Sequence, residues 1–143
     1  MTTLSSETVH ASTVSIGGRA VLIAGRPGSG KSDLALRLID RGAILVSDDY
    51  TILTRSGDGL LASAPETIRG RIEVRGIGLI GMPFENAVPV ALIVTLDDPV
   101  VRMPEPDQSR TLAGISLPLV ALAAFEVSAP IKIEQMLKSL TTA

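Results

Sequence analysis

A glycine-rich segment near the N-terminus has the residue types and the spacing that phosphate binding requires. It reads glycine, four residues, glycine, lysine and serine. Glycines permit backbone angles that a side chain would forbid, so backbone N–H groups can converge on phosphate oxygens where a helix begins. Lys31 would bring a positive charge to the β- and γ-phosphates, and the Ser32 hydroxyl can ligate Mg²⁺. The sequence therefore predicts a nucleotide-binding P-loop made of Gly25, Arg26, Pro27, Gly28, Ser29, Gly30, Lys31 and Ser32.

The residues on either side of this segment support the same prediction. An apolar run over 20–24 precedes it and indicates a strand, and an amphipathic stretch over 33–39 follows it and indicates a helix. A glycine-rich turn that only links a strand to a helix is the alternative. The glycine spacing, the lysine and the flanking elements together favour the phosphate-binding function.

Two acid pairs could complete such a site, because P-loop proteins hold their metal with an acid at the end of a neighbouring strand. Asp48 and Asp49 follow a short apolar run one helix beyond the P-loop. Asp97 and Asp98 follow the strongest strand signal, and a proline comes next, so this pair could simply begin a turn. Spacing alone does not separate the two pairs. In the first pair, one carboxylate could touch the metal and the other could accept a hydroxyl proton, and a solvated turn is the alternative.

A third candidate is the stretch over 72–80, in which charged and apolar residues alternate. The alternation places Glu73 and Arg75 on one face of a strand. Glu73 could complete a metal shell, and Arg75 could stabilise phosphoryl charge during transfer; an ion-paired surface strand is the alternative. His10 is the single histidine, and by itself a lone histidine is more often structural or exposed.

Composition narrows the class of protein. The chain has 143 residues, 45% of them hydrophobic but only 2% aromatic, so its core must consist of aliphatic side chains, as in strands buried between helices. A net charge of −2 without a basic run argues against nucleic acid as a partner. There is no cysteine for disulfides, and no apolar segment reaches the ~20 residues of a membrane helix. We expect a soluble cytoplasmic protein.

The pattern along the chain predicts an α/β fold, a single P-loop domain over 8–143 with a mixed β-sheet and flanking helices, after a flexible tail over 1–7. Hairpins before and after the P-loop unit argue against a standard doubly wound sheet. One helix should run to about Asp40 with Gly42 as its cap, and another from Ser128 to near Leu140. Residues 99–114 should form a loop. Strands are expected at 9–16, 19–24, 43–46, 50–55, 60–63, 71–74, 90–96 and 117–123. Glycines 76 and 78 should break the strand pattern beyond residue 74.

Four segments in the same order resemble HPr kinase/phosphorylase, specifically its C-terminal catalytic domain in a short form without the N-terminal domain. They are Val9–Ser12, Gly25–Ser32, Leu45–Asp49 and Ile72–Gly78. The last of these is the most specific, and it favours the first acid pair over the second. The resemblance covers roughly residues 8 to 80 strongly and the rest weakly.

This resemblance implies an ATP- and Mg²⁺-dependent serine kinase of the phosphocarrier protein HPr. The same enzyme would remove the phosphate by phosphorolysis, with inorganic phosphate as co-substrate and pyrophosphate as product. It implies that Asp48 is the general base toward the serine hydroxyl and the general acid in reverse, supported by Asp49. His10 would lie by the phosphate pocket, Mg²⁺ would be surrounded by Ser32, Asp48 and Glu73, and the protein would form a hexamer.

The chain departs from the family pattern at three places. Pro27 stands where many members have serine, the polar loop over 102–114 is short, and Ala123–Ser128 replaces a Pro-Gly-Arg-Asn stretch. Two other functions remain open. One is a small-molecule P-loop kinase with Arg102 and Arg110 in a lid, and the other is a non-catalytic nucleotide or phosphate sensor that binds a partner protein.

Overall fold

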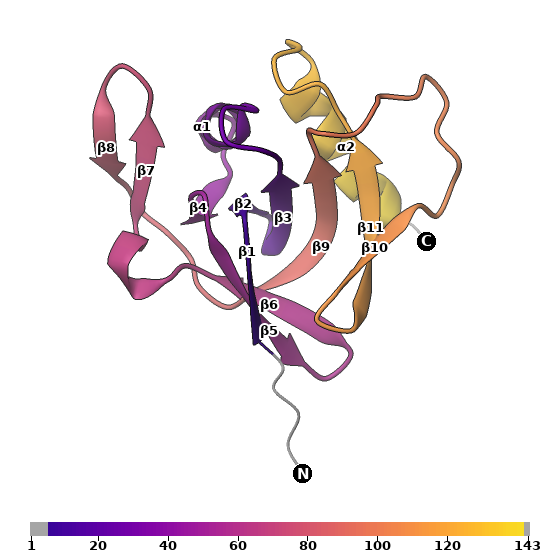
Figure 1. Cartoon of the computed structure of the whole chain (residues 1–143), viewed down its shortest axis with the longest axis horizontal. Helices are drawn as coiled ribbons and strands as arrows, with labels where there is room; N and C mark the ends of the chain where they lie inside the picture. The colour runs from indigo at the N-terminus through magenta and orange to yellow at the C-terminus, as the bar shows by residue number, and fades with distance from the viewer. Residues whose placement is uncertain (1–5, 142–143) are drawn as a thin grey trace.

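The computed structural model describes residues 6–141, which are mostly β-strands with two α-helices (Figure 1). The helices are α1 (Lys31–Asp40) and α2 (Ala129–Thr141), with a short 3-10 turn at Glu66–Ile68. The strands are β1 (Ser6–Val9), β2 (Ala11–Ile16), β3 (Arg19–Ala24), β4 (Ile44–Ser47), β5 (Thr51–Ser56), β6 (Gly59–Ser63), β7 (Arg71–Val74), β8 (Gly78–Gly81), β9 (Val88–Thr95), β10 (Ser109–Leu112) and β11 (Ile115–Ala121).

The central part of the sheet has the strand order β4, β2, β3, β9, β11. Strands β3 and β9 are parallel, and β9 and β11 are parallel. Strand β2 is antiparallel to both β3 and β4, so β4 runs in the same direction as β3. The carboxyl ends of β3, β4, β9 and β11 therefore point to one edge of the sheet. This is where ligands bind in most α/β folds.

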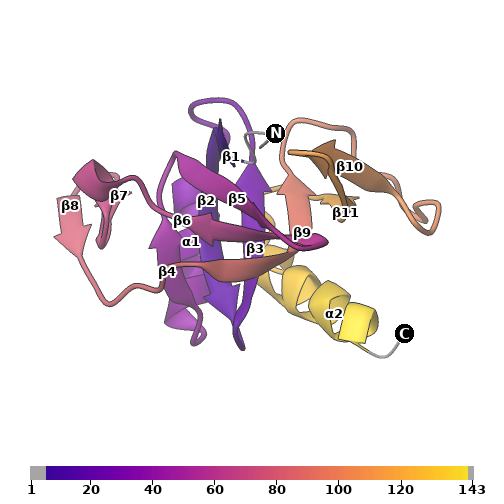
Figure 2. The same ribbon diagram turned by 90° about the horizontal axis from the view of Figure 1, so that it is seen from below.

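A second group of strands curls away from the central part. Strands β1, β5 and β6 are antiparallel neighbours, and β6 pairs with the first residues of β9, Val88 and Pro89. Strand β9 thus belongs to both groups and carries the bend between them. The β7–β8 hairpin forms a separate two-stranded sheet and stands to one side of the molecule in both views (Figures 1 and 2).

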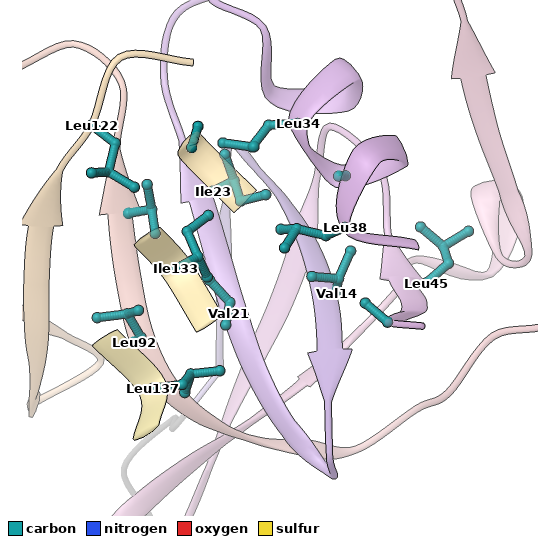
Figure 3. Close-up of a cluster of buried hydrophobic side chains, with 14 of the residues drawn as sticks. Val14, Val21, Ile23, Leu34, Leu38, Leu45, Leu92, Leu122, Ile133 and Leu137 are labelled. Carbon is teal, nitrogen blue, oxygen red and sulfur yellow. The ribbon is translucent and has the colours of Figure 1, made fainter. Parts of the chain in front are cut away.

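Two apolar clusters cover the two faces of the central strands. Because side chains alternate along a strand, Val21 and Ile23 of β3 join the cluster under α1 and α2, while Ala20 and Leu22 join the cluster under β5 and β6. Figure 3 shows the first cluster, in which helix side chains meet the strands. Its largest fully buried helix side chains are Leu34, Leu38, Ile133 and Leu137.

The structure confirms the predicted α/β fold with a mixed sheet and flanking helices. Helix α1 ends as predicted, because Gly42 has a φ of 109° and its N–H donates to the Ile39 carbonyl at 3.0 Å. Helix α2 begins where predicted, with the Lys132 N–H donating to the Ser128 carbonyl at 2.8 Å. Neither helix in the described part of the chain is long and apolar enough to cross a lipid bilayer.

Several predicted boundaries were wrong. The predicted tail over 1–7 is wrong for its last two residues, because Ser6 and Glu7 begin β1 and pair with β5. Residues 1–5 lie outside the described residues. The predicted strand over 9–16 is two strands, since the chain bends at His10 to pass from the β1–β5 group to the central group. Strand β1 is mostly polar, and β2 mixes serine and threonine with apolar residues, so tertiary pairing rather than apolar periodicity defines the boundary between them.

Two more strands lie where loops were expected. The predicted loop over 99–114 contains β10, which pairs antiparallel with β11 and begins a hairpin whose turn includes Gly114 with a φ of 80°. Glycines 76 and 78 do not end the strand pattern but shape the turn into β8. Both cases are hairpins closed by residues with positive φ, which apolar periodicity does not reveal.

Candidate functional site

A pocket of about 290 Å³ lies at the edge of the sheet where the parallel strands end. It collects side chains and backbone from the loop after β3, from α1, from the end of β4, from β7 and from the loop after β11. Its lining residues are Gly28, Gly30, Lys31, Ser32, Asp33, Leu36, Asp48, Asp49, Glu73, Val74, Arg75 and Phe125.

The loop over 25–32 is wound tightly against the start of α1. Gly28 and Gly30 have φ values of 82° and 101°, in the region that favours glycine. The Ser29 N–H donates to the Arg26 carbonyl at 3.0 Å, and Lys31 Nζ donates to the same carbonyl at 3.1 Å. The Lys31 side chain is only 5% exposed. The first N–H groups of α1 have no acceptor within the helix, so the loop offers an amine and backbone donors to an anion.

The outer part of the same loop is held by an acid. Arg26 donates its backbone N–H to Asp97 Oδ1 at 3.1 Å, and its guanidinium lies 3.3 Å from that oxygen. Asp98 pairs instead with Arg110 at 3.4 Å. The second acid pair of the sequence therefore positions the loop and a neighbouring strand. Asp97 does not contact Ser32, which was the alternative left open by spacing.

Asp48 is the acid that meets the lysine–serine end of the loop. Its Oδ1 accepts hydrogen bonds from Ser32 Oγ at 2.6 Å and from Ser12 Oγ at 2.9 Å. Its Oδ2 accepts the Glu73 N–H at 2.9 Å. The residue is 8% exposed. Three donors from β2, α1 and β7 thus fix one carboxylate beside the Ser32 hydroxyl.

Asp49 forms hydrogen bonds and ion pairs with a different set of residues. Its φ of 68° lies in the left-handed region, and its N–H donates to Ser12 Oγ at 3.1 Å. Its Oδ1 lies 2.7 Å from His10 Nε2 and 3.9 Å from Lys31 Nζ. The His10 ring stacks on Tyr50 with centroids 4.9 Å apart. His10 therefore contacts Asp49, which lines the pocket, but does not line the pocket itself.

Glu73 and Arg75 both line the pocket, while Ile72, on the opposite face of β7 from Glu73, is buried in the core. The ion pairs found among the described residues include neither Glu73 nor Arg75, so the alternative of an ion-paired surface strand does not hold. No cluster of three or more His, Cys, Asp or Glu side chains occurs in residues 6–141 that could hold a metal alone. Asp48 and Glu73 both line the pocket, and Asp48 contacts the Ser32 hydroxyl; carboxylate and hydroxyl oxygens are donors of the kind that Mg²⁺ accepts together with phosphate or water oxygens.

Two further residues belong to this site, and sequence reasoning did not assign them a role. Ser12 joins Asp48 to Asp49 through its single hydroxyl. Phe125 lines the pocket from the loop after β11 and is 71% exposed. The sequence signal that could have pointed to Phe125 is its rarity, because the chain has only two phenylalanines.

Comparison with known proteins points to one family. A family model described as HPr Serine kinase C-terminal domain matches residues 2–86. A protein named HPr kinase/phosphorylase from Alkaliphilus metalliredigens is 37% identical over 131 residues, and one of the same name from Bordetella pertussis is 34% identical over 128 residues. The solved structure of the Hpr(Ser) kinase/phosphatase from Coxiella burnetii matches with a TM-score of 0.78 and 30% identity, over 95% of this chain and 91% of that one.

The matches cover most of this chain but a smaller part of the two relatives. The alignments span 87% and 80% of the chain, but only 42% of each relative. The shared part includes the loop over 25–32, both acids after β4 and the β7 segment, because the family model extends to residue 86.

Proposed function

This chain belongs to the HPr serine kinase C-terminal domain family, and on that premise we propose that it transfers the γ-phosphoryl group of ATP to a serine of the phosphocarrier protein HPr. We propose in addition that it removes this phosphate with inorganic phosphate. The observation that carries the proposal is the position of Asp48, which three hydrogen bonds hold beside Ser32 at the mouth of the glycine-rich loop.

ATP is proposed to bind with its phosphates on the loop over 25–32. Backbone donors at the start of α1 would meet the phosphate oxygens, and Lys31 would exchange its bond to the Arg26 carbonyl for the β- and γ-phosphates. Asp49, 3.9 Å from Lys31, would keep the amine near the pocket before the nucleotide enters. Mg²⁺, held by Ser32, Asp48 and Glu73, would neutralise charge on the β- and γ-oxygens.

Asp48 is proposed to move the proton. In the kinase direction it takes the proton of the substrate serine, the serine oxygen forms a bond to the γ-phosphorus, and the bond to the β–γ bridging oxygen breaks to release ADP. In the reverse direction an oxygen of inorganic phosphate attacks the phosphoserine phosphorus. The serine oxygen then leaves with the proton from Asp48, and the product is pyrophosphate.

Asp49, His10 and Arg75 would support this chemistry from the two sides of the pocket. The His10–Asp49 contact at 2.7 Å fixes the second carboxylate, so that it orients Lys31 rather than competing with Asp48 for the proton. Arg75 lines the pocket without an ion-pair partner among residues 6–141, which leaves its charge for the transferring phosphoryl group.

Partner and assembly follow from the family and are part of the same proposal. HPr would be the protein substrate, the chain would act in the cytoplasm, and it would form a homo-oligomer, a hexamer by family resemblance. A small-molecule kinase would need arginines over the nucleotide, but neither Arg102 nor Arg110 lines the pocket, and Arg110 pairs with Asp98. Light scattering of the purified chain would test the hexamer.

The test is phosphate transfer from ATP to purified HPr with Mg²⁺, with phosphorylated HPr and inorganic phosphate in a parallel reaction. Asp48→Asn should lower both rates by about 10²- to 10⁴-fold, the usual contribution of a general acid–base group. Asp98→Asn is the matched control, since Asp98 follows a neighbouring strand but faces Arg110. Wild-type rates in Asp48→Asn would disprove the assigned base. Nucleotide binding by the wild type without either reaction would instead indicate the sensor.

A further inference from the structure

The strand order places two different groups on opposite sides of the glycine-rich loop. This loop follows β3, Asp48 follows β4, and Phe125 follows β11. Strand β4 lies on one side of β3 and β11 on the other, as Figure 1 also shows. All three strands end at the same edge, so the pocket has carboxylates at one end and an aromatic ring at the other.

The Phe125 ring lies directly against the loop backbone. A Cβ built on Gly30 would be 2.9 Å from the Ala124 Cβ and 2.9 Å from a ring carbon of Phe125. Gly30 is thus the residue that allows the ring to approach the start of α1. Although it makes this contact, Phe125 is 71% exposed, and it lines the pocket.

Helix α1 fixes the segment that carries the ring. Arg37 donates from Nη1 to the Glu126 carbonyl at 3.1 Å and from Nη2 to the Ala124 carbonyl. Its Nε donates to Asp33 at 3.0 Å, which holds the guanidinium in place. The two carbonyls flank Phe125 in the sequence, so the backbone on both sides of the ring is tied to the helix that begins at the loop.

We propose that Phe125 is the surface on which the base of the nucleotide stacks. This inference rests on the proposed ATP binding. The γ-phosphate must face Asp48, because that carboxylate takes the proton of the attacking hydroxyl. The α-phosphate and the nucleoside then lie across the start of α1 from Asp48, on the β11 side of the loop, where Phe125 is the exposed apolar group of the pocket lining.

Stacking on an aromatic ring has a defined consequence for specificity. Every base has a π-face, so a stacking contact contributes to affinity without selecting one base. Phe125 therefore contributes to binding of ATP and GTP alike and contributes nothing to binding of a phosphate chain without a nucleoside. This separates the ring from Lys31 and the loop backbone, which act on all three ligands.

The experiment compares ATP, GTP and inorganic tripolyphosphate, each with Mg²⁺, by calorimetric titration of the purified full chain. Phe125→Ala should weaken ATP and GTP binding by about tenfold and leave tripolyphosphate binding unchanged. Phe125→Trp should keep wild-type affinity for both nucleotides. Val127→Ala is the matched control, since Val127 lies two residues further along the same segment and is 91% exposed. In HPr phosphorylation, Phe125→Ala should raise KM for ATP and leave kcat unchanged.

Two results would overturn the inference. Unchanged ATP affinity in Phe125→Ala would mean that the base lies elsewhere. An equal loss for ATP and tripolyphosphate would mean that the ring only supports the loop. Failure of the wild type to bind any of the three ligands would instead remove the proposed function and this inference with it, so the two failures are distinguishable.

Discussion

Replacing Asp48 by alanine or by asparagine should separate the structural role of this residue from its proposed chemical role. Alanine removes the acceptor of three hydrogen bonds, from Ser12, Ser32 and the Glu73 N–H. Asparagine keeps the shape. Its amide oxygen can accept the Glu73 N–H, and its NH₂ group can donate to the two hydroxyls, which can rotate to accept.

The magnitude depends on what each donor can do after the substitution. A buried donor left without an acceptor costs about 1–3 kcal/mol, and a backbone N–H cannot turn toward another acceptor as a hydroxyl can. One N–H left without an acceptor, and two hydroxyls that lose this acceptor but can rotate toward another, place Asp48→Ala about 3 kcal/mol below the wild type in free energy of unfolding. Asp48→Asn exchanges charged for neutral hydrogen bonds and should lose about 1 kcal/mol.

The assay is urea unfolding followed by far-ultraviolet circular dichroism, without nucleotide or metal. Asp98→Ala serves as the control, because its ion pair with Arg110 is exposed and should change the unfolding midpoint little. An Asp48→Ala midpoint at or above that of the wild type would refute the reasoning. It would mean that repulsion among Asp48, Asp49 and Glu73 outweighs the three hydrogen bonds.

Three other substitutions test the elements that build the pocket. Gly30→Ala should lower stability by at least about 1 kcal/mol in thermal unfolding, because a φ of 101° is strained for alanine; wild-type stability would contradict the loop geometry. Leu38→Ala should lose about 3 kcal/mol in urea unfolding, since this side chain is 0% exposed between helix and sheet, and a loss below about 1 kcal/mol would contradict that packing. The Arg41 hydrogen bond lowers the pKa of Glu134, so this pair stabilises the fold above the ordinary carboxyl pKa and ceases to do so as pH falls through the lowered one. Glu134→Gln should unfold at lower urea than the wild type at neutral pH, and the gap should narrow as the pH falls below the ordinary carboxyl pKa; a gap that stays constant into acid would point to lost packing instead.

The sequence by itself determined the glycine-rich loop, the strand before it and the helix after it. These depend on local physics. Glycine spacing sets the backbone angles, apolar runs of five residues or more mark buried strands, and Gly42 ends α1. The segment Ile72–Gly78 and the acids after β4 also indicated the family, and the match of the family model to residues 2–86 shows that family.

Only the tertiary structure decided which acid meets Ser32. Both acid pairs follow strands that end at the same edge of the sheet, so local sequence treats them alike. Pairing of β2 with β4 brings Asp48 to Ser32, and pairing of β9 with β3 brings Asp97 to Arg26.

The same holds for the groups that no local pattern marks. Ser12 acts through one hydroxyl that reaches two acids 36 and 37 residues away in the sequence. Phe125 lies on the pocket because parallel pairing of β9 and β11 carries its loop to the start of α1. Such contacts depend on the pairing of strands that are far apart in the sequence. The energy of that pairing is distributed over the whole sheet, so no single segment predicts it.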